Sequence, residues 1–136
     1  MLRLIFTFLL ASFVLLPRSQ AVELKEAQKL WDRYKACEKT QQDDDRFGEC
    51  LDGVFGSKVK SMERVKLGSF LIMGYEFSAL RACAKGDLKP GNTLKTQFYY
   101  CMDVLGKKSK HPGYILLELE NKKPVLTAIK YSEATL

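Results

Sequence analysis

The feature that most constrains this 136-residue chain is its four cysteines, at positions 37, 50, 83 and 101. A short exported chain with an even number of cysteines typically folds around disulfides. Twelve residues separate Cys37 from Cys50 and 17 separate Cys83 from Cys101, whereas paired zinc ligands usually lie about two to four residues apart. We therefore expect two disulfides, and neither a metal site nor a cofactor.

Export is indicated by the first 21 residues, which have the organisation of a secretory signal peptide. Arg3 supplies a positive start, residues 4–16 are almost entirely apolar, and residues 19–21 place small side chains at a cleavage site. A 13-residue apolar stretch is too short to cross a bilayer, which takes about 20 residues. We predict cleavage before Val22, a periplasmic or secreted protein and no stable membrane span afterwards. The alternative is an uncleaved anchor.

Composition excludes several classes of protein. The chain has 22 Lys and Arg against 16 Asp and Glu, a net charge of +6 that falls to +4 without residues 1–21. This excess is too small to argue for nucleic acid. A hydrophobic fraction of 46% with 28% charged residues excludes disorder. The length then predicts a signal peptide over residues 1–21 and one domain over residues 22–136.

The mature chain shows helical periodicity over most of its length. The predicted helices cover residues 23–39, 47–55, 57–84 and 93–105. The aspartates at 43–45 suit the N-cap and first turn of the second helix. The third helix is apolar nearly all round, so we expect it to be buried on several sides. The predicted fold class is mainly α, a four-helix bundle stapled by disulfides.

Four cysteines allow three connectivities. The pairing of Cys37 with Cys50 and of Cys83 with Cys101 is favoured, because each pair would then flank a helix–turn–helix. Each link would stabilise the fold by roughly 3 kcal/mol on the loop-entropy model.

The hydrophobic period changes to two in the C-terminal part, which predicts a β-hairpin over residues 114–131. Residues 121–123 would form a three-residue turn. The residues predicted to face one another are Ile115, Leu117 and Leu119 on one strand and Val125, Thr127 and Ile129 on the other. Such a hairpin is marginal alone in water, so its apolar face must lie on the helices or on another chain.

Several motifs follow one another in an order that suggests a family. Leu30–Cys37 ends the first predicted helix in a cysteine, and Cys50–Gly56 places a glycine six residues after the next one. Pro90 then precedes a Gly-Asn-Thr-Leu step at residues 91–94, and Pro112 follows the fourth predicted helix. Over about residues 30–112, this order resembles the Rap/Tai immunity proteins, which protect bacteria against type VI-secreted peptidoglycan amidases.

The resemblance implies a function and a partner. It implies a non-enzymatic inhibitor, and also a homodimer, that occludes the active-site cleft of a peptidoglycan amidase. We predict that the loops Lys85–Asn92 and Lys107–Gly113 contact this partner, with Leu88 as an apolar anchor and charged residues around it. The predicted contact residues are Lys85, Asp87, Leu88, Lys89, Lys107, Lys108, Lys110 and His111. Two plainer interpretations stay open: Leu88 pins its loop to the core, and the second loop is only solvated, with an exposed His111.

Two other functions compete with the inhibitor. A different exported binding module would use the hairpin edge, its charged loops or one basic face for an anionic ligand. That face would consist of Lys107, Lys108, Lys110, Lys122, Lys123 and Lys130. An enzyme is disfavoured, because His111 is the only histidine and the sequence contains no recognisable nucleophile–base pair or metal constellation.

Overall fold

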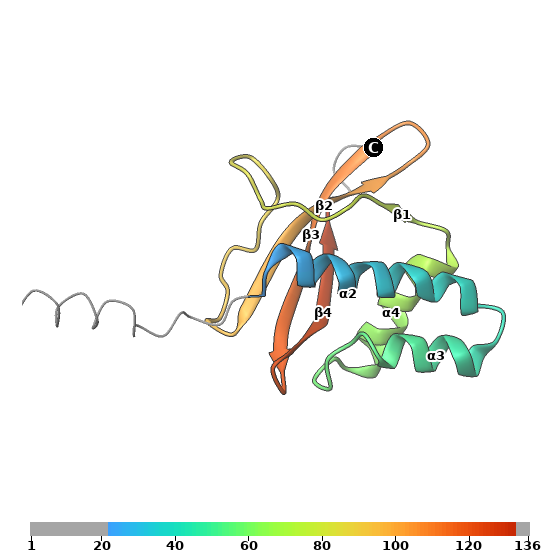
Figure 1. Ribbon diagram of the computed structural model, residues 1–136. Coiled ribbons are helices and arrows are strands. Elements are labelled where there is room, and N and C mark those ends of the chain that lie inside the picture. The colour runs from blue at the N-terminus through green and yellow to red at the C-terminus, as the bar shows by residue number, and fades with distance from the viewer. Residues whose placement is uncertain (1–21, 133–136) are drawn as a thin grey trace, which may run out of the picture.

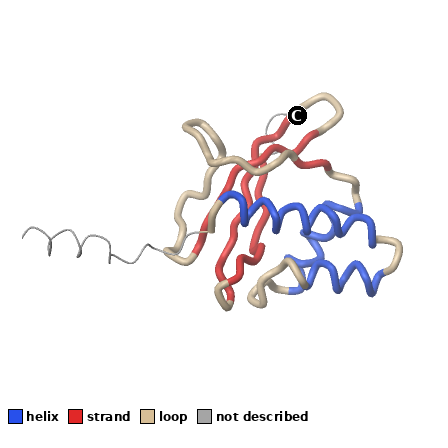
Figure 2. Tube along the Cα trace, viewed as in Figure 1, coloured by secondary structure: helices blue, strands red, loops and turns tan. Residues whose placement is uncertain are grey.

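The structure is a computed structural model that describes residues 22–132. Within that range, three α-helices and a short 3-10 helix come first, and a four-stranded antiparallel sheet follows (Figure 2). The elements are α2 (Leu24–Ala36), η1 (Cys37–Thr40), α3 (Asp44–Asp52), α4 (Ser61–Ile72), β1 (Glu76–Phe77), β2 (Gln97–Leu105), β3 (Lys110–Glu120) and β4 (Lys123–Tyr131). The predicted mainly α, four-helix bundle is wrong, because the second half of the chain forms a sheet.

The core lies between the helices and one face of this sheet. Helix α2 crosses the sheet, and α3 and α4 lie next to each other beyond it (Figure 1). Both α2 and α4 contact β4, so the apolar face of the C-terminal hairpin is covered by helices as it must be in water. The largest fully buried side chains include Trp31, Tyr34, Leu67, Leu71, Met102, Ile115, Leu117 and Leu126.

The first two predicted helices are confirmed. Helix α2 buries Trp31 and Tyr34 from its predicted apolar stripe. Helix α3 begins after Asp43, whose carboxylate accepts hydrogen bonds from the backbone N–H groups of Asp45 and Arg46 at 3.1 and 3.2 Å. These two bonds satisfy N–H groups that have no partner inside the helix. The aspartate run therefore caps α3, as predicted.

The third predicted helix, residues 57–84, is too long, because α4 ends before Gly74. The backbone N–H of Gly74 donates to the carbonyl of Leu71 at 3.1 Å, and that of Tyr75 donates to Phe70 at 3.0 Å. This pair of bonds is a Schellman motif, which ends a helix at a left-handed residue. Gly74 has a φ of 77°, a conformation that glycine adopts without steric cost. The residues that follow form β1 instead of more helix.

The fourth predicted helix, residues 93–105, is a strand over most of its length. Strand β2 pairs with β1 on one side and with β3 on the other. Every second residue of β2 packs into or against the core: Phe98, Tyr100, Met102 and Val104. Aromatic and β-branched side chains favour such a half-buried pleated surface. The spacing of three and four residues that predicted a helix came from side chains on both faces of this strand.

The predicted C-terminal hairpin is confirmed, and it is longer than residues 114–131 because β3 begins at Lys110. Its turn differs from the prediction. Glu120 pairs with Lys123, which leaves two turn residues instead of three. Asn121 and Lys122 both have positive φ values, 52° and 65°. Two left-handed residues in succession are typical of a type I′ turn, whose twist matches that of the flanking strands.

The hairpin register is right at one end and shifted at the other. Ile115 faces Ile129 as predicted, but Leu117 faces Leu126 and not Thr127. The register shifts between Leu116 and Leu117, where Thr127 is the extra residue of a β-bulge on β4. The bulge turns Leu126 into the core, where it is 1% exposed. An alternation that is perfect in the sequence is therefore broken once in the sheet.

Both favoured disulfides are confirmed. Cys37 pairs with Cys50 at a Cα–Cα distance of 5.7 Å, and Cys83 pairs with Cys101 at 5.1 Å. The reason given for the second pair is wrong, because that disulfide joins the segment after β1 to strand β2 and not two helices. Two disulfides are compatible with an oxidising, extracytoplasmic environment. The predicted signal peptide, residues 1–21, lies outside the described residues, and no helix within 22–132 could span a membrane.

Candidate functional site

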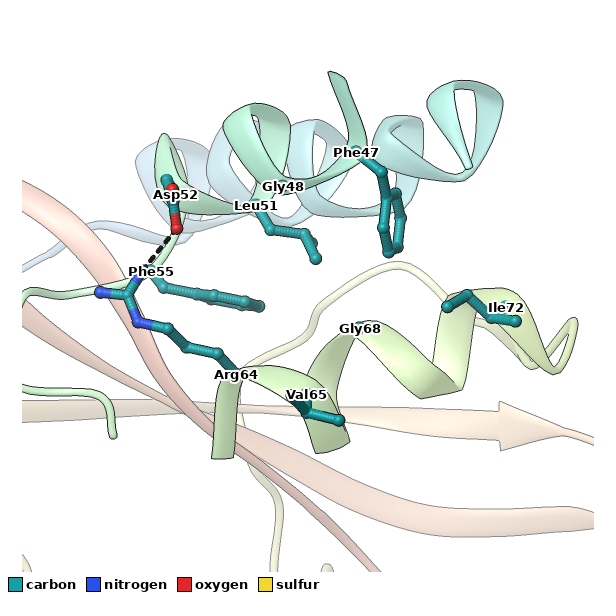
Figure 3. A pocket seen from close by; sticks show the side chains of 9 residues that line it. All are labelled: Phe47, Gly48, Leu51, Asp52, Phe55, Arg64, Val65, Gly68 and Ile72. Carbon is teal, nitrogen blue, oxygen red and sulfur yellow. Dashed lines mark hydrogen bonds and ion pairs between the residues drawn. The ribbon is translucent and has the colours of Figure 1, made fainter. Parts of the chain in front are cut away.

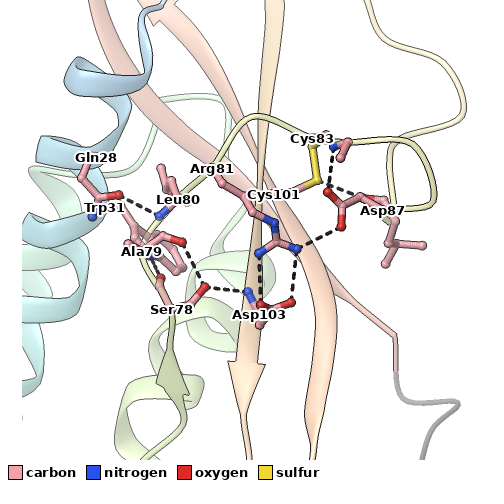
Figure 4. Close-up of polar contacts among 12 residues, drawn as sticks. Gln28, Trp31, Ser78, Ala79, Leu80, Arg81, Cys83, Asp87, Cys101 and Asp103 are labelled. Atoms are coloured by element: carbon pink, nitrogen blue, oxygen red, sulfur yellow. Dashed lines mark hydrogen bonds and ion pairs between the residues drawn. A yellow bond between two sulfur atoms is a disulfide. The ribbon is translucent and has the colours of Figure 1, made fainter.

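The first predicted partner loop begins where the chain leaves the sheet. The backbone of Arg81 exchanges two hydrogen bonds with that of Cys101 on β2, at 2.8 and 2.9 Å. Two residues later, the second disulfide joins Cys83 to the same Cys101 (Figure 4). The chain is thus held to β2 by its backbone and by a covalent bond. We refer to residues 81–89 as the tied loop.

The guanidinium group of Arg81 links two carboxylates (Figure 4). Its Nη1 and Nη2 atoms donate to the two oxygens of Asp103 on β2 at 3.1 and 3.3 Å, and Nη2 also donates to Asp87 at 3.0 Å. The other Asp87 oxygen accepts the backbone N–H of Ala84 at 2.8 Å. The Ala84 N–H and Arg81 hold the pKa of Asp87 below its usual value. The hydrogen bond to Asp87, together with Asp103, raises the pKa of Arg81.

This network closes a turn that presents two lysines. The backbone N–H of Asp87 donates to the carbonyl of Ala84 at 3.1 Å. Lys85 and Lys89 are exposed on either side of Asp87, and Leu88 is half-buried. The Leu88 carbonyl oxygen lies 3.3 Å from a sulfur of the disulfide. Part of the Leu88 side chain therefore stays accessible on a backbone that is fixed at both ends.

The second predicted partner loop, residues 107–113, is shorter than expected because β3 begins at Lys110. Lys107, Lys108 and Lys110 are exposed, as a contact surface requires. His111 is not: it is 8% exposed, with its Nε2 atom 3.1 Å from the Ser109 hydroxyl. The expectation of an exposed histidine is wrong, because His111 lies on the inward face of β3, opposite Val104. Most of its side chain is therefore covered by the rest of the protein.

The six lysines proposed as one basic face are not brought together. Lys107 and Lys108 lie in the connection between β2 and β3, whereas Lys122 lies in the turn between β3 and β4. These turns are at opposite ends of β3, which has 11 residues and so extends about 36 Å at 3.3 Å per residue. A single anionic ligand would not reach both groups.

A groove between α3 and α4 was not predicted. It has a volume of about 280 Å³ and is lined mainly by apolar side chains: Phe47, Leu51, Phe55, Val65 and Ile72. Arg64 closes one end by an ion pair with Asp52, with a distance of 2.6 Å between nitrogen and oxygen (Figure 3). The other end lies between Phe47 and Ile72 and is not bridged in this way. We refer to this feature as the α3–α4 groove.

Two glycines line the α3–α4 groove, and packing within the chain requires glycine at only one of them. A Cβ atom on Gly68 of α4 would lie 3.0 Å from the Leu51 side chain, so glycine there allows the two helices to pack closely. A Cβ atom on Gly48 of α3 would meet nothing within 4 Å. Glycine in a helix interior is less stable than alanine by about 1 kcal/mol. The groove is therefore open at Gly48 without any packing requirement.

Helix α4 presents apolar side chains outward as well as inward. Leu67, Phe70 and Leu71 are buried. The outward residues Met62, Val65 and Ile72 are 85%, 72% and 60% exposed, and Met73, directly after the helix, is 62% exposed. The sequence predicted burial on several sides of this helix, yet one side is open. A signal for the groove was present in the sequence: a helix apolar all round beside a short helix with a central glycine.

Comparison with known proteins assigns neither a family nor a function. No protein-family model matches this sequence, and no curated protein or solved structure shows significant similarity to it. The functional argument depends on geometry. Among residues 22–132, no group of three or more His, Cys, Asp or Glu side chains is placed to hold a metal ion.

Proposed function

We propose that this protein is an exported, non-enzymatic binding module that presents the tied loop to a protein partner. The observation that carries this proposal is the position of Arg81, which pairs with Asp87 in the loop and with Asp103 in the sheet. Together with the disulfide at Cys83, this pairing fixes the loop before any partner arrives. A fixed loop loses little conformational entropy on binding, so more of its contact energy appears as affinity.

The form of the loop suits insertion into a cleft. Leu88 offers part of an aliphatic side chain, and Lys85 and Lys89 flank it. A few apolar anchors at the centre of an interface carry most of its binding energy. Charges at the rim mainly set the association rate and its dependence on salt. Leu88 would therefore act as the anchor and the two lysines as the rim.

The Rap/Tai resemblance supports a peptidoglycan amidase as the partner and the periplasm as the location. Its support is the order of motifs between Leu30 and Pro112. The structure departs from the mainly α fold predicted from the sequence, because a strand occupies residues 97–105. The choice of partner thus depends on the motifs, while the choice of binding surface depends on the tied loop.

The test combines the purified oxidised protein with an exported amidase encoded beside it and measures peptidoglycan hydrolysis. We expect inhibition at near-equal molar amounts. The paired change Lys85→Glu and Lys89→Glu should slow association, and the effect should shrink as salt is raised. The matched control reverses two exposed lysines far from the loop in sequence, Lys25→Glu and Lys39→Glu, and should inhibit as the unmodified protein does.

A second variant examines the anchor. Leu88→Asp should abolish inhibition while the melting temperature stays within a few degrees of that of the unmodified protein. A large fall in melting temperature would instead show that Leu88 pins the loop to the core. Full inhibition by Leu88→Asp would place the binding surface elsewhere. Lack of inhibition by the unmodified protein would rule out the amidase as the partner.

A further inference from the structure

A hollow between α2 and the start of β4 is lined mainly by positive charge. Helix α2 crosses the sheet and contacts β4 (Figure 1). The hollow has a volume of about 330 Å³ and is lined by Glu26, Lys29, Leu30, Arg33, Lys123 and Pro124. Three positive charges and one negative charge give this lining a net charge of +2. We refer to this feature as the α2–β4 hollow.

The helical period of α2 brings four of the lining residues together. Residues three, four and seven positions apart share one face of an α-helix, and Glu26, Lys29, Leu30 and Arg33 follow this spacing. Leu30 is buried and Pro124 is half-buried, whereas the charged side chains of the lining are exposed. The hollow therefore has an apolar floor and a charged rim.

Among the residues that the structure describes, the cations of the hollow form no ion pair. Of the five ion pairs within residues 22–132, none includes Lys29, Arg33 or Lys123. The carboxylate of Glu120, which pairs with Lys123 across the turn, accepts the backbone N–H of Ser57 at 3.0 Å instead. A concave surface lined by one sign of charge concentrates the electrostatic potential and attracts ligands of the opposite sign.

The fold fixes the supports of two of these cations. Nη2 of Arg33 donates to the carbonyl of Gly53 at 3.0 Å, which holds the guanidinium group at the end of α3. Lys123 directly follows the type I′ turn, in which Lys122 has a φ of 65°. Glycine is the usual residue in such a left-handed position, so a positive charge is kept beside the hollow at a conformational cost. A cluster that is fixed in advance loses little entropy when it binds.

We propose that the α2–β4 hollow binds a small ligand that carries at least two negative charges, as phosphate or carboxylate groups. Lysine and arginine donate charge-assisted hydrogen bonds to both groups. The apolar part of the ligand would lie on Leu30 and Pro124. The volume is near the lower limit of small-molecule sites, which measure about 300–1,000 Å³. The hollow thus suits a small molecule better than a folded partner.

This site is separate from the tied loop. The tied loop is bonded to Cys101, which lies opposite Tyr114 on β3. The turn that precedes Lys123 begins seven residues after Tyr114, a distance of about 23 Å along a strand at 3.3 Å per residue. Both sites could be occupied at once, so the proposal does not rest on the proposed inhibitor function.

NMR titration of the purified oxidised protein tests the proposal, with inorganic pyrophosphate and citrate as separate probes at constant ionic strength. We expect saturable shifts of the Leu30 and Lys123 amide signals, with a dissociation constant of about 1 mM or lower for at least one probe. Tighter binding of pyrophosphate would identify phosphate as the preferred group, and tighter binding of citrate would identify carboxylate.

Two double variants separate the hollow from a general attraction of anions to a basic protein. Lys29→Gln with Lys123→Gln should raise the dissociation constant at least about tenfold, because two charge-assisted hydrogen bonds are lost. The matched control, Lys39→Gln with Lys95→Gln, removes the same charge from exposed lysines that do not line the hollow. This control should leave the dissociation constant within about twofold of the original, since distant exposed charges are screened by salt.

A change of opposite sign is expected at Glu26. Glu26→Gln removes the only negative charge of the lining and should lower the dissociation constant. The side chains changed in all of these variants are exposed, so their melting temperatures without ligand should match that of the unmodified protein. Loss of binding in a variant that keeps its melting temperature then reports on the site and not on folding.

The proposal fails on any of three results. Absence of saturable shifts at Leu30 and Lys123 with both probes would show that the hollow takes no such ligand, and binding of an acidic peptide such as hexa-aspartate in their place would assign it to a protein segment. Equal weakening by the two double variants would mean that anions respond to net charge alone. Weaker binding by Glu26→Gln would contradict the electrostatic argument.

Discussion

The two disulfides are similar in themselves and different in their surroundings. Each joins a fully buried cysteine, Cys37 or Cys101, to a half-buried one. Cys37 belongs to the hydrophobic core cluster of the described residues and Cys50 packs against it, whereas Cys101 lies outside that cluster. The first disulfide is thus part of the helical core, and the second fastens the tied loop to the outer side of the sheet. One bond supports the fold and the other shapes a surface.

The largest expected effect comes from removing the disulfides one at a time. The loop-entropy model gives about 3 kcal/mol for each, because their closed loops are similar in length. Replacing Cys37 and Cys50 by alanine should lower the free energy of unfolding further, by about 1 kcal/mol for the gap left in the core. Replacing Cys83 and Cys101 should cost less in this respect, because Cys101, although fully buried, lies outside the core cluster. Chemical denaturation of the two double variants measures the difference.

A second measurement on the same variants makes the comparison sharper. Without the Cys83–Cys101 bond, trypsin should cleave rapidly after Lys85 while the rest of the chain stays folded. Without the Cys37–Cys50 bond, cleavage should follow global unfolding and occur at many sites. Equal patterns of cleavage would mean that the two disulfides play the same part. Free thiols in the unreduced protein would contradict both bonds.

A smaller effect is expected at Tyr34, which lies in the helical core one turn before Cys37. Its hydroxyl donates to the Leu67 carbonyl at 2.6 Å, linking α2 to α4. Tyr34→Phe should lower the free energy of unfolding by about 1 kcal/mol near neutral pH, the usual worth of such a bond. Denaturation at pH 7 measures this loss, and an unchanged stability would show that the bond contributes nothing.

The same substitution should change the dependence of stability on pH. Burial raises the pKa of Tyr34 above the ordinary tyrosine value of about 10. Above that value the unfolded chain loses a proton that the folded chain keeps, so the stability contributed by Tyr34 is present below pH 10 and falls as the pH rises. The stability advantage over Tyr34→Phe should therefore shrink between pH 10 and 11. Parallel stability curves would contradict this burial effect.

The helical region was predicted from the sequence much better than the sheet, and the reason is physical. Around α2 and α3, local signals agree: the apolar period, the Asp43 cap and the first disulfide all favour the same helices. Strand β2 depends on pairing with β3, a contact between residues far apart in the sequence that local patterns do not reveal. The apolar residues of β2 fit both a helical and a strand period. Gly74 was a local signal for the end of α4, because a glycine often ends a helix in a left-handed conformation.

The candidate sites show the same contrast. The loop from Lys85 was predicted as a partner contact, and its position beside Cys101 followed from the favoured disulfide. The pairing of Arg81 with Asp103 could not be predicted, because the two residues are 22 positions apart and meet only across strands. The burial of His111 was missed for a related reason, since its environment depends on which face of β3 is covered.

The smallest expected effect is confined to the tied loop. Asp87 has a lowered pKa, first because the Ala84 N–H donates to its carboxylate and then because of Arg81. The contribution of Asp87 to the stability of the tied loop is therefore present above the unfolded value of about 3.9 and is lost as the pH falls through the lower folded value.

Asp87→Asn should reproduce that loss at neutral pH, because the amide keeps an acceptor oxygen and removes the charge that holds Arg81. Hydrogen exchange of the Ala84 and Asp87 amides should then be faster by up to about tenfold, whereas the global free energy of unfolding should not change measurably. The matched control, Asp44→Asn on α3, should leave exchange in the loop as it is. A change in global stability equal to the change in loop exchange would show that the loop opens only when the whole domain unfolds, and the distinction between the two disulfide regions would then be lost.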